Sequence, residues 1–179
     1  MKIIKRILIG ILGLIVLLLI IALFVPNQYT VTTTETVNRP SQEVFDYVKI
    51  LENQRFYSVW LMKDPQLKPE IVGTDGTVGA IQKWNSANED VGEGEQEITA
   101  LTSDRMDVDL RFIRPFKGEA KAAMMVKSTG PDQTLVTSEF YSDSKYPFNL
   151  PAYVFGKKMM FDAETQNLKN IKQILEKGK

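Results

Sequence analysis

The sequence predicts an α+β protein in which a curved antiparallel sheet of about seven strands surrounds one long C-terminal helix, with one transmembrane helix in front. Three observations lead to this expectation. An uninterrupted apolar run lies near the N-terminus, short alternating segments separated by turn residues fill the middle, and a helical pattern occupies the end. The expected domains are an N-terminal anchor at residues 1–26 and a folded domain at residues 27–179.

The anchor is expected from Ile7 to Val25, which are only Ile, Leu, Val, Ala, Gly and Phe. At about 1.5 Å per residue this run is about 28 Å long as a helix, roughly the hydrocarbon thickness of a bilayer. Lys2, Lys5 and Arg6 precede it, so the N-terminus is expected in the cytoplasm and the folded domain outside it.

A cleaved signal peptide is the alternative interpretation of the same run. The apolar core of a signal peptide is usually about 7–15 residues long and ends at small residues. Here the core is longer, and Phe24-Val25-Pro26-Asn27 offers no such cleavage site. We therefore expect a single-pass membrane protein that contacts the lipid bilayer from Ile7 to Val25.

Composition excludes several classes of function. Lys plus Arg and Asp plus Glu are 22 each, so the chain lacks the basic surplus of a nucleic-acid binder. It contains neither Cys nor His, which excludes Ser-His-Asp and Cys-His hydrolases, disulfides, and zinc sites with thiolate or imidazole ligands. Gly73, Gly76 and Gly79 precede no Lys-Ser/Thr pair, so no phosphate loop is expected. We expect no metal, no cofactor and no identifiable catalytic residue.

The folded domain begins with a strand at 29–37, rich in Thr and Val. Pro40 then opens a short helix that buries Val44, Phe45 and Val48, and an irregular helical piece follows at 51–56. Turn residues separate six further expected strands, at 66–72, 78–85, 92–101, 105–113, 118–127 and 134–141. Short connections of this kind favour an antiparallel meander.

Alternation along these strands predicts one charged face and one apolar face. For example, Met106, Val108, Leu110 and Phe112 alternate with acidic and basic residues, while Glu93, Glu95 and Glu97 share the outer face. The closing helix is expected to begin with Asn149 as its N-cap and Pro151 in its first turn, and to end near Glu176. Its buried stripe is expected to contain Tyr153, Met160, Leu168, Ile171 and Leu175.

A series of soft motifs follows the same order along residues 29–176. They are Asn38-Arg39-Pro40-Ser41-Gln42-Glu43-Val44-Phe45-Asp46-Tyr47-Val48, Trp60 with Lys63-Asp64-Pro65, Gly79 with Trp84, Gly92-Glu93-Gly94, Ile113-Arg114-Pro115-Phe116-Lys117-Gly118, and Tyr146-Pro147-Phe148-Asn149-Leu150. With these motifs the chain resembles the START-like (SRPBCC, Bet v 1-like) superfamily and its bacterial polyketide cyclase/dehydrase-like members. The resemblance implies a helix-grip fold with a hydrophobic cavity between sheet and long helix, for lipids, polyketides or other apolar molecules. Ser138 departs from the aromatic residue that many such domains carry there.

The expected cavity wall combines inward side chains of the sheet with two from the helix. The apolar members are Trp84, Phe112, Met124, Phe140, Tyr153 and Met160, and the polar residues that would orient a ligand are Gln82, Gln96 and Ser138. Ligand pockets have this mixture of an apolar lining with few polar groups. The same residues would look alike if they simply filled a core, and the sequence leaves both interpretations open. The small inward residues Gly92, Gly94, Ala120 and Ala122 are expected to leave open space or to admit the helix.

Two charged features complete the expectations. Arg111, Arg114 and Lys117 surround Phe116 and either meet anionic lipid headgroups or belong to a solvated loop. Glu35 shares the parity of Val37 and is the carboxylate most expected to turn inward.

Three functions remain open. They are a membrane-anchored domain that binds a hydrophobic small molecule or lipid, a non-catalytic envelope interaction domain with a filled core, and a polyketide cyclase-like enzyme. A buried carboxylate with a shifted pKa would favour the enzyme, whereas a solid interior would favour the interaction domain.

Overall fold

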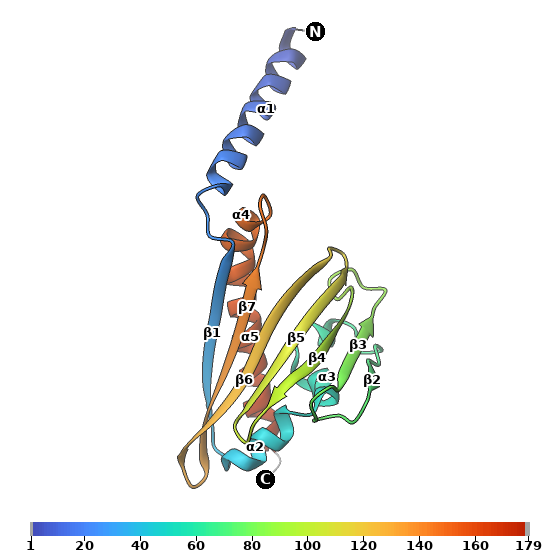
Figure 1. Cartoon of the computed structure of the whole chain (residues 1–179), viewed down its shortest axis with the longest axis vertical. Coiled ribbons are helices and arrows are strands. Elements are labelled where there is room, and N and C mark those ends of the chain that lie inside the picture. The colour runs from blue at the N-terminus through green and yellow to red at the C-terminus, as the bar shows by residue number, and fades with distance from the viewer. Residues whose placement is uncertain (1, 178–179) are drawn as a thin grey trace.

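Seven antiparallel strands form one continuous sheet in the computed structural model, which describes residues 2–177 (Figure 1). The order across the sheet is β1-β7-β6-β5-β4-β3-β2. The strands are β1 (Gln28–Val37), β2 (Glu70–Val72), β3 (Ile81–Asn85), β4 (Glu93–Leu101), β5 (Arg105–Arg114), β6 (Gly118–Gly130) and β7 (Gln133–Asp143). The predicted meander is therefore confirmed, and the first strand pairs with the last. Residues 1 and 179, the outer ends of the two predicted domains, lie outside the described residues.

Two predicted strands are shorter than expected. The segment predicted at 66–72 forms a strand only at Glu70–Val72, and the one predicted at 78–85 begins at Ile81. Pro69 has no N–H to donate to a ladder, which delays the first of them. Gly79 has a φ of +88°, a turn conformation rather than an extended one, which delays the second.

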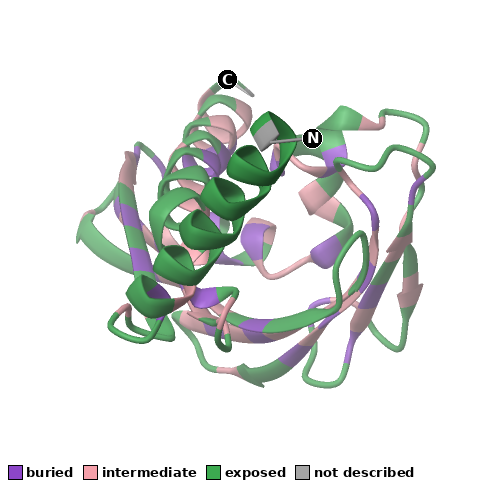
Figure 2. Cartoon of the chain, turned by 90° about the horizontal axis from the view of Figure 1, so that it is seen from above, coloured by how far each residue is buried: buried purple, intermediate pink, exposed green. Residues whose placement is uncertain are grey.

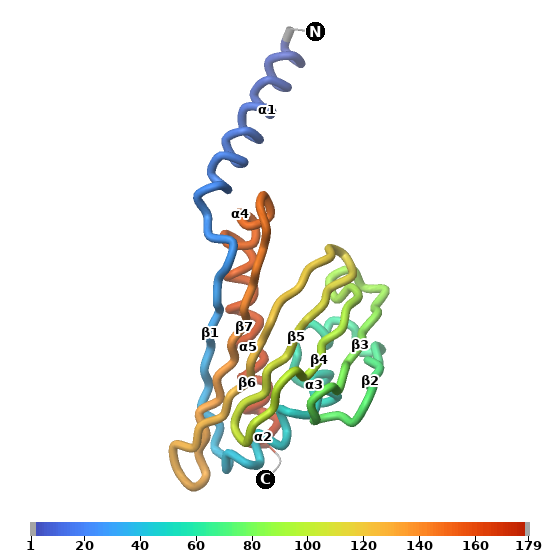
Figure 3. The backbone as a smooth tube through the Cα atoms, in the orientation of Figure 1, coloured from blue at the N-terminus to red at the C-terminus, as the bar shows by residue number. Residues whose placement is uncertain are grey.

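The helices fill the concave side of the sheet, which curves around them (Figure 2). Between β1 and β2 lie α2 (Ser41–Val48), η1 (Leu51–Asn53), α3 (Gln54–Tyr57) and η2 (Leu61–Lys63). After β7 the chain forms one long helical stretch, composed of α4 (Asn149–Pro151), a π-helical turn η3 (Ala152–Gly156) and α5 (Lys157–Lys177). The apolar helix α1 (Lys2–Ala22) projects away from the domain, and a short connection, residues 23–27, leads from it into β1 (Figure 3).

The π-helical turn changes which residues of the final helix face the sheet. Leu168 and Ile171 are buried as predicted, and Met160 and Leu175 are partly buried. Tyr153, predicted to belong to the same stripe, is 36% exposed. Tyr153 lies within this turn. A π turn contains one residue more than an α turn, so the residues in it and before it are rotated relative to a continuous 3.6-residue period. The prediction for Tyr153 assumed that unbroken period and was wrong.

The buried apolar residues form two clusters at opposite ends of the domain. The larger cluster, here called the distal core, lies away from α1 and includes Val37, Val48, Val136, Leu168 and Ile171. The smaller one, here called the proximal interior, lies nearest α1. It consists of Val31, Ala120 and Phe140, with Tyr29, Leu110, Phe112, Ala122 and Met160 partly buried around them. The distal core contains many residues that are fully inaccessible, whereas most of the proximal interior is only partly covered.

The join between α1 and the domain differs from the prediction. The helix ends at Ala22, so the last three residues of the apolar run, Leu23 to Val25, lie outside it. Asn149 is not an N-cap, since that position belongs to Phe148. Instead, the Asn149 side-chain amide donates to the carbonyl oxygens of Ala22 at 2.8 Å and Val25 at 2.9 Å. A carbonyl left free at the end of α1 thus finds its partner in the folded domain.

Candidate ligand-binding interior

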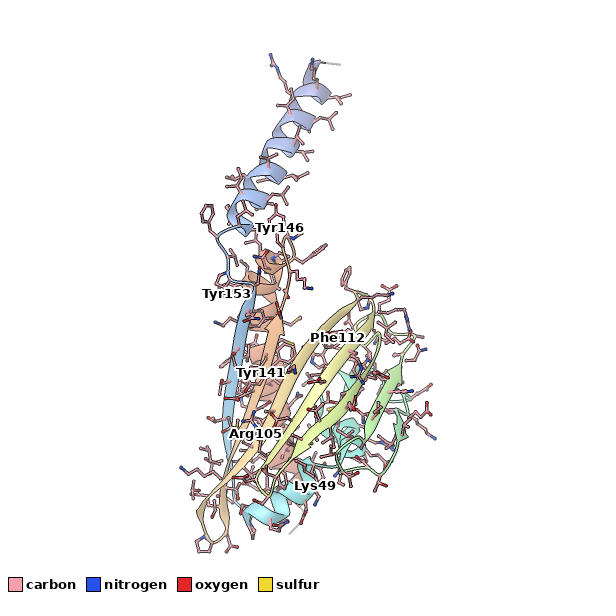
Figure 4. All side chains as sticks on the ribbon, viewed as in Figure 1. Lys49, Arg105, Phe112, Tyr141, Tyr146 and Tyr153 are labelled. Carbon is pink, nitrogen blue, oxygen red and sulfur yellow. The ribbon has the colours of Figure 1, made fainter. Side chains whose placement is uncertain are left out.

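An aromatic pair forms the end of the inner sheet surface nearest α1. Gly94 pairs across the ladders with Trp84 on one side and Phe112 on the other. The two rings lie edge to face, with centroids 6.2 Å apart, and Figure 4 shows Phe112 near the α1 end of β5. A Cβ on Gly94 would lie 2.6 Å from the Trp84 ring and 2.6 Å from the Arg111 carbonyl oxygen. The small residue therefore admits the indole ring, rather than leaving open space or admitting the helix.

The structure brings five of the six predicted apolar wall residues to the inner face. Met124 and Phe140 are buried there, while Trp84, Phe112 and Met160 are only partly covered. Tyr153 is more exposed, and it packs edge to face against Tyr29 of the proximal interior, with Lys157 above its ring. Phe112 and Met160 belong to the proximal interior, and Trp84 contacts Phe112, so apolar surface remains accessible at this end.

The predicted polar residues are buried and inward, and all three are hydrogen-bonded within the protein. Gln82 donates to the Leu51 carbonyl oxygen at 2.6 Å. Gln96 donates to the side-chain oxygens of Gln82 at 2.7 Å and Gln54 at 2.6 Å. These amides tie the sheet to η1 and α3, because a buried polar group needs its partner. They hold the wall in place, and their donors are in use.

Glu164 is the functional candidate that sequence reasoning missed. Ser138 donates to its Oε2 at 2.7 Å, and Asn167 donates to its Oε1 at 3.4 Å. Within residues 2–177 no Lys or Arg forms an ion pair with this carboxylate. Burial raises the pKa of Glu164, although the hydrogen bonds from Ser138 and Asn167 oppose that rise. The signal was available, since residue 164 lies four positions after Met160 and four before Leu168 on the inward stripe.

Further polar groups surround this carboxylate. Thr33 lies directly opposite Ser138 on the neighbouring strand, and its buried hydroxyl has no hydrogen-bond partner among the described residues. Tyr57 is buried below, where burial, with the charge of Glu164 as a second cause, raises the pKa of its phenol. Asn167 also accepts from the Val59 amide at 2.8 Å, which fixes its position. Polar groups thus gather on one side of an otherwise apolar interior.

Glu35, the carboxylate expected to turn inward, has an ion-pair partner. It lies opposite Val136 on the inner side of the sheet, as its parity predicted. Its Oε1 is 3.1 Å from the Lys172 ammonium of α5. Because this pair is half-exposed, it joins the sheet to the helix and leaves no free carboxylate there.

Two open hollows lie on the surface of the described residues, and neither is an enclosed cavity inside the domain. One, of about 670 Å³, is lined by Pro26, Asn27, Gln28, Asp143 and Lys145 beside the end of α1. The other, of about 720 Å³, runs between β1 and the final helix and is lined by Thr30, Val31, Thr32, Tyr153, Val154, Lys157, Lys158, Phe161 and Asp162. Both lie toward the α1 end. The enclosed cavity implied by the family resemblance therefore stays a prediction.

The outer face of the sheet carries a network of ion pairs. Arg111 binds Glu95 at 2.7 Å and Glu97 at 2.8 Å, and Arg114 binds Glu93 at 2.8 Å. These contacts raise the pKa of Arg111, mainly through its hydrogen bonds to the two glutamates. Two of the three cations near Phe116 are thus neutralised, which favours a solvated surface over a headgroup site. No group of three or more carboxylates in the described part of the chain could hold a metal ion.

Comparison with known structures identifies the type of fold. No protein-family model and no curated protein matches the sequence. Norcoclaurine synthase from Thalictrum flavum, in complex with dopamine and hydroxybenzaldehyde, has a TM-score of 0.64 at 15% identity, covering 85% of this chain and 88% of that chain. Ara h 8.0201 has a TM-score of 0.60 at 13% identity, covering 84% and 99% respectively. The chain has the Bet v 1-like helix-grip fold.

A third structural neighbour is DynU16, a protein of the dynemicin biosynthetic locus. Its TM-score is 0.59 at 15% identity, covering 84% of this chain and 48% of that chain. At such identities the fold is shared, whereas function depends on the side chains of each protein. The helix-grip fold predicted from the motifs is confirmed.

Proposed function

We propose that this protein is a membrane-anchored domain that binds a hydrophobic small molecule or lipid between its sheet and its C-terminal helix. The ligand would occupy the proximal interior, at the end nearest the bilayer. One observation carries the proposal: Trp84, Leu110, Phe112, Ala122 and Met160 are inner-face apolar residues that the fold leaves partly accessible. Such a surface is stabilised when an apolar molecule removes it from water.

Ser138 and Glu164 give the ligand a preferred direction. An apolar lining supplies affinity, and a few polar groups at one place supply orientation. A hydroxyl or amine on the ligand would donate to the Glu164 carboxylate, which has no cationic partner of its own among residues 2–177. One structural neighbour was solved in complex with dopamine and hydroxybenzaldehyde, which supports the capacity of this fold for small molecules.

The anchor in this proposal is α1, with the N-terminus in the cytoplasm and the domain on the other side. α1 is the one helix among the described residues that is long and apolar enough to cross a membrane. Its flank of Lys2, Lys5 and Arg6 supports the orientation. The hydrogen bonds from Asn149 to Ala22 and Val25 support retention over cleavage, because cleavage after the apolar run would leave a buried amide without its partners.

Native mass spectrometry of the full-length chain tests the binding proposal. Ala122→Trp places a large side chain in the proximal interior, and Ala100→Trp, at an exposed position of β4, is the matched control. The protein is released from nanodiscs, and apolar molecules that stay bound are counted. Wild type and Ala100→Trp are expected to retain them, and Ala122→Trp to lose most of them. An empty wild-type protein, or equal occupancy in all three, would contradict the proposal.

A polyketide cyclase-like enzyme is the second candidate, and the raised pKa of Glu164 favours it. A carboxyl whose pKa is raised by burial is suited to proton transfer near neutral pH. The neighbour from the dynemicin biosynthetic locus is consistent with this direction. If Glu164 transfers protons, Glu164→Gln will abolish turnover of a cyclisable apolar ligand while the ligand remains bound. If it only orients the ligand, the substitution will weaken binding.

A further inference from the structure

The end of α1 is fixed to the domain rather than joined by a free linker. Ala22, the last residue of α1, is only 2% exposed, because α4 covers it. The Asn149 amide bonds the Ala22 and Val25 carbonyl oxygens, so it spans the point where the helix ends. A domain held in this way presents one defined surface to whatever surrounds the end of α1.

That surface is rich in exposed aromatic and aliphatic side chains. Phe24 is 84% exposed, Phe148 and Phe155 are each 72% exposed, and Tyr146 and Val154 about half. They come from the α1–β1 connection, the β7–α4 loop and the first turns of the final helix. Figure 4 shows Tyr146 beside the end of α1. Isolated exposed apolar residues are common, but several large ones on the segments that meet at the end of α1 indicate a surface that something covers.

The charges around this group fit a bilayer surface. Lys145 and Lys157 flank it on long aliphatic stems, and Lys157 lies 5.2 Å above the Tyr153 ring. Lys158 is neighbouring but is paired with Asp162. Lysine stems cover apolar surface while their ammonium groups stay in water or near phosphates. Tyrosine also concentrates where hydrocarbon meets headgroups. Asp162, which pairs with Lys158, lies further down the helix.

We propose that Phe24, Tyr146, Phe148, Val154 and Phe155, here called the collar, lie among the lipid headgroups of the bilayer that α1 crosses. This inference rests on the proposed membrane span of α1. The apolar collar continues the apolar surface of α1, and its depth follows from the fixed end at Ala22. The domain thereby sits on the leaflet in one orientation, with the Trp84–Phe112 end of its interior turned toward lipid. A ligand from the leaflet would then reach the proximal interior without crossing bulk water.

The absence of cysteine from the sequence allows a direct test. Single cysteines are introduced in the full-length chain as Phe148→Cys, Phe155→Cys, Leu17→Cys and Asp132→Cys, and each is labelled with a small fluorophore in nanodiscs. Leu17 lies within α1, and Asp132 lies in the β6–β7 turn at the opposite end of the domain (Figure 1). Lipids with a quencher near the headgroup are expected to reduce fluorescence at 148 and 155 at least twofold more than at 132.

The Leu17→Cys label separates the two proposals. One outcome would overturn the collar and leave the membrane span of α1 intact. In it, lipids with a quencher deep in the acyl chain strongly quench the label at position 17, but labels at 148 and 155 are quenched no more than the label at 132. No quenching at position 17 would overturn both proposals.

A second measurement uses a reference protein in which all five collar residues are native. With the label at Lys145→Cys, Phe148→Ser with Phe155→Ser is expected to remove the quenching, and Phe56→Ser, an exposed phenylalanine on α3, is expected to preserve it.

Discussion

The two ends of the domain interior are built from similar residue types but are packed differently. In the distal core, Val37, Val48, Val136 and Ile171 have no exposed surface. In the proximal interior, Tyr29, Phe112 and Met160 remain partly accessible, and Leu110 and Ala122, also partly accessible, pack against both clusters. Close packing stabilises a fold, whereas accessible apolar surface costs free energy unless a guest covers it. Under the proposed function, the distal core maintains the fold and the proximal interior receives the ligand.

The largest expected effect is the loss of stability when a side chain is truncated in the distal core, compared with the proximal interior. Ile171→Ala is expected to lower the free energy of unfolding by about 2–5 kcal/mol, because it leaves a cavity in a closely packed site. Met160→Ala is expected to cost about 1 kcal/mol, since water already reaches that side chain. Chemical denaturation of the full-length chain in micelles, followed by circular dichroism, measures both. Equal costs would support the filled-core interaction domain instead.

The next effect concerns the aromatic end of the proximal interior. Gly94→Ala is expected to destabilise by about 1–3 kcal/mol, because its Cβ would lie within 2.6 Å of the Trp84 ring and of a backbone oxygen. Gly118→Ala is the control, since a Cβ there meets nothing within 4 Å. A shifted near-ultraviolet circular dichroism signal should accompany the first substitution only. An unchanged melting temperature for Gly94→Ala would show that the indole ring lies elsewhere.

A pH-dependent effect is expected from Glu164, between the two ends. Its folded-state pKa is raised above the ordinary value of 4.5, so from about that pH upward the native state holds a proton that the unfolded state has released. Stability from this group is therefore greatest at low pH and declines as pH rises through the folded-state pKa. Glu164→Gln should lack this decline. Its free energy of unfolding, relative to wild type, should thus increase with pH in denaturation series from pH 4 to 8. A difference independent of pH would contradict the assignment.

The smallest effect is expected on the outer face. Arg111→Ala removes ion pairs to Glu95 and Glu97, but more than a third of the Arg111 side chain is exposed, so the loss should be below about 1 kcal/mol. Added salt should reduce the difference further. Ligand occupancy should be unaffected, because these side chains lie opposite the interior. A loss of bound ligand would indicate that the ligand contacts the outer face of the sheet, which would contradict the proposed binding site.

Much of this fold follows from local pattern. The alternation in β5 and β7 and the apolar run of α1 are strong periodic signals, so strand order and the long final helix were predictable. The predictions that were wrong concern features that the spacing of apolar residues does not encode. A π turn rotated Tyr153, Pro69 shortened β2, and Asn149 bonded α1 across the chain instead of capping its own helix.

The candidate site was less predictable than the fold. The inward residues of the sheet were found by parity, but Glu164 was passed over because a charged residue on a buried stripe is usually assigned to the surface. Its partner Ser138 was predicted as a polar residue of the cavity wall, but no carboxylate was predicted beside it. Which inward residues stay accessible depends on the curvature of the whole sheet around the helix. No local segment determines that property, so packing at the two ends could not be distinguished from sequence.

Trp84 offers the most direct measurement of the central claim, because its ring belongs to the proposed binding surface. Trp60→Phe leaves Trp84 as the single tryptophan of the chain. In nanodiscs, a brominated fatty acid is added to this variant and to the same variant with the additional substitution Ala122→Phe. Phenylalanine is used at position 122 because it is bulky and adds no tryptophan fluorescence. We expect saturable quenching of Trp84 that Ala122→Phe abolishes. Quenching that rises linearly without saturation, or is equal in both proteins, would contradict ligand binding in the proximal interior.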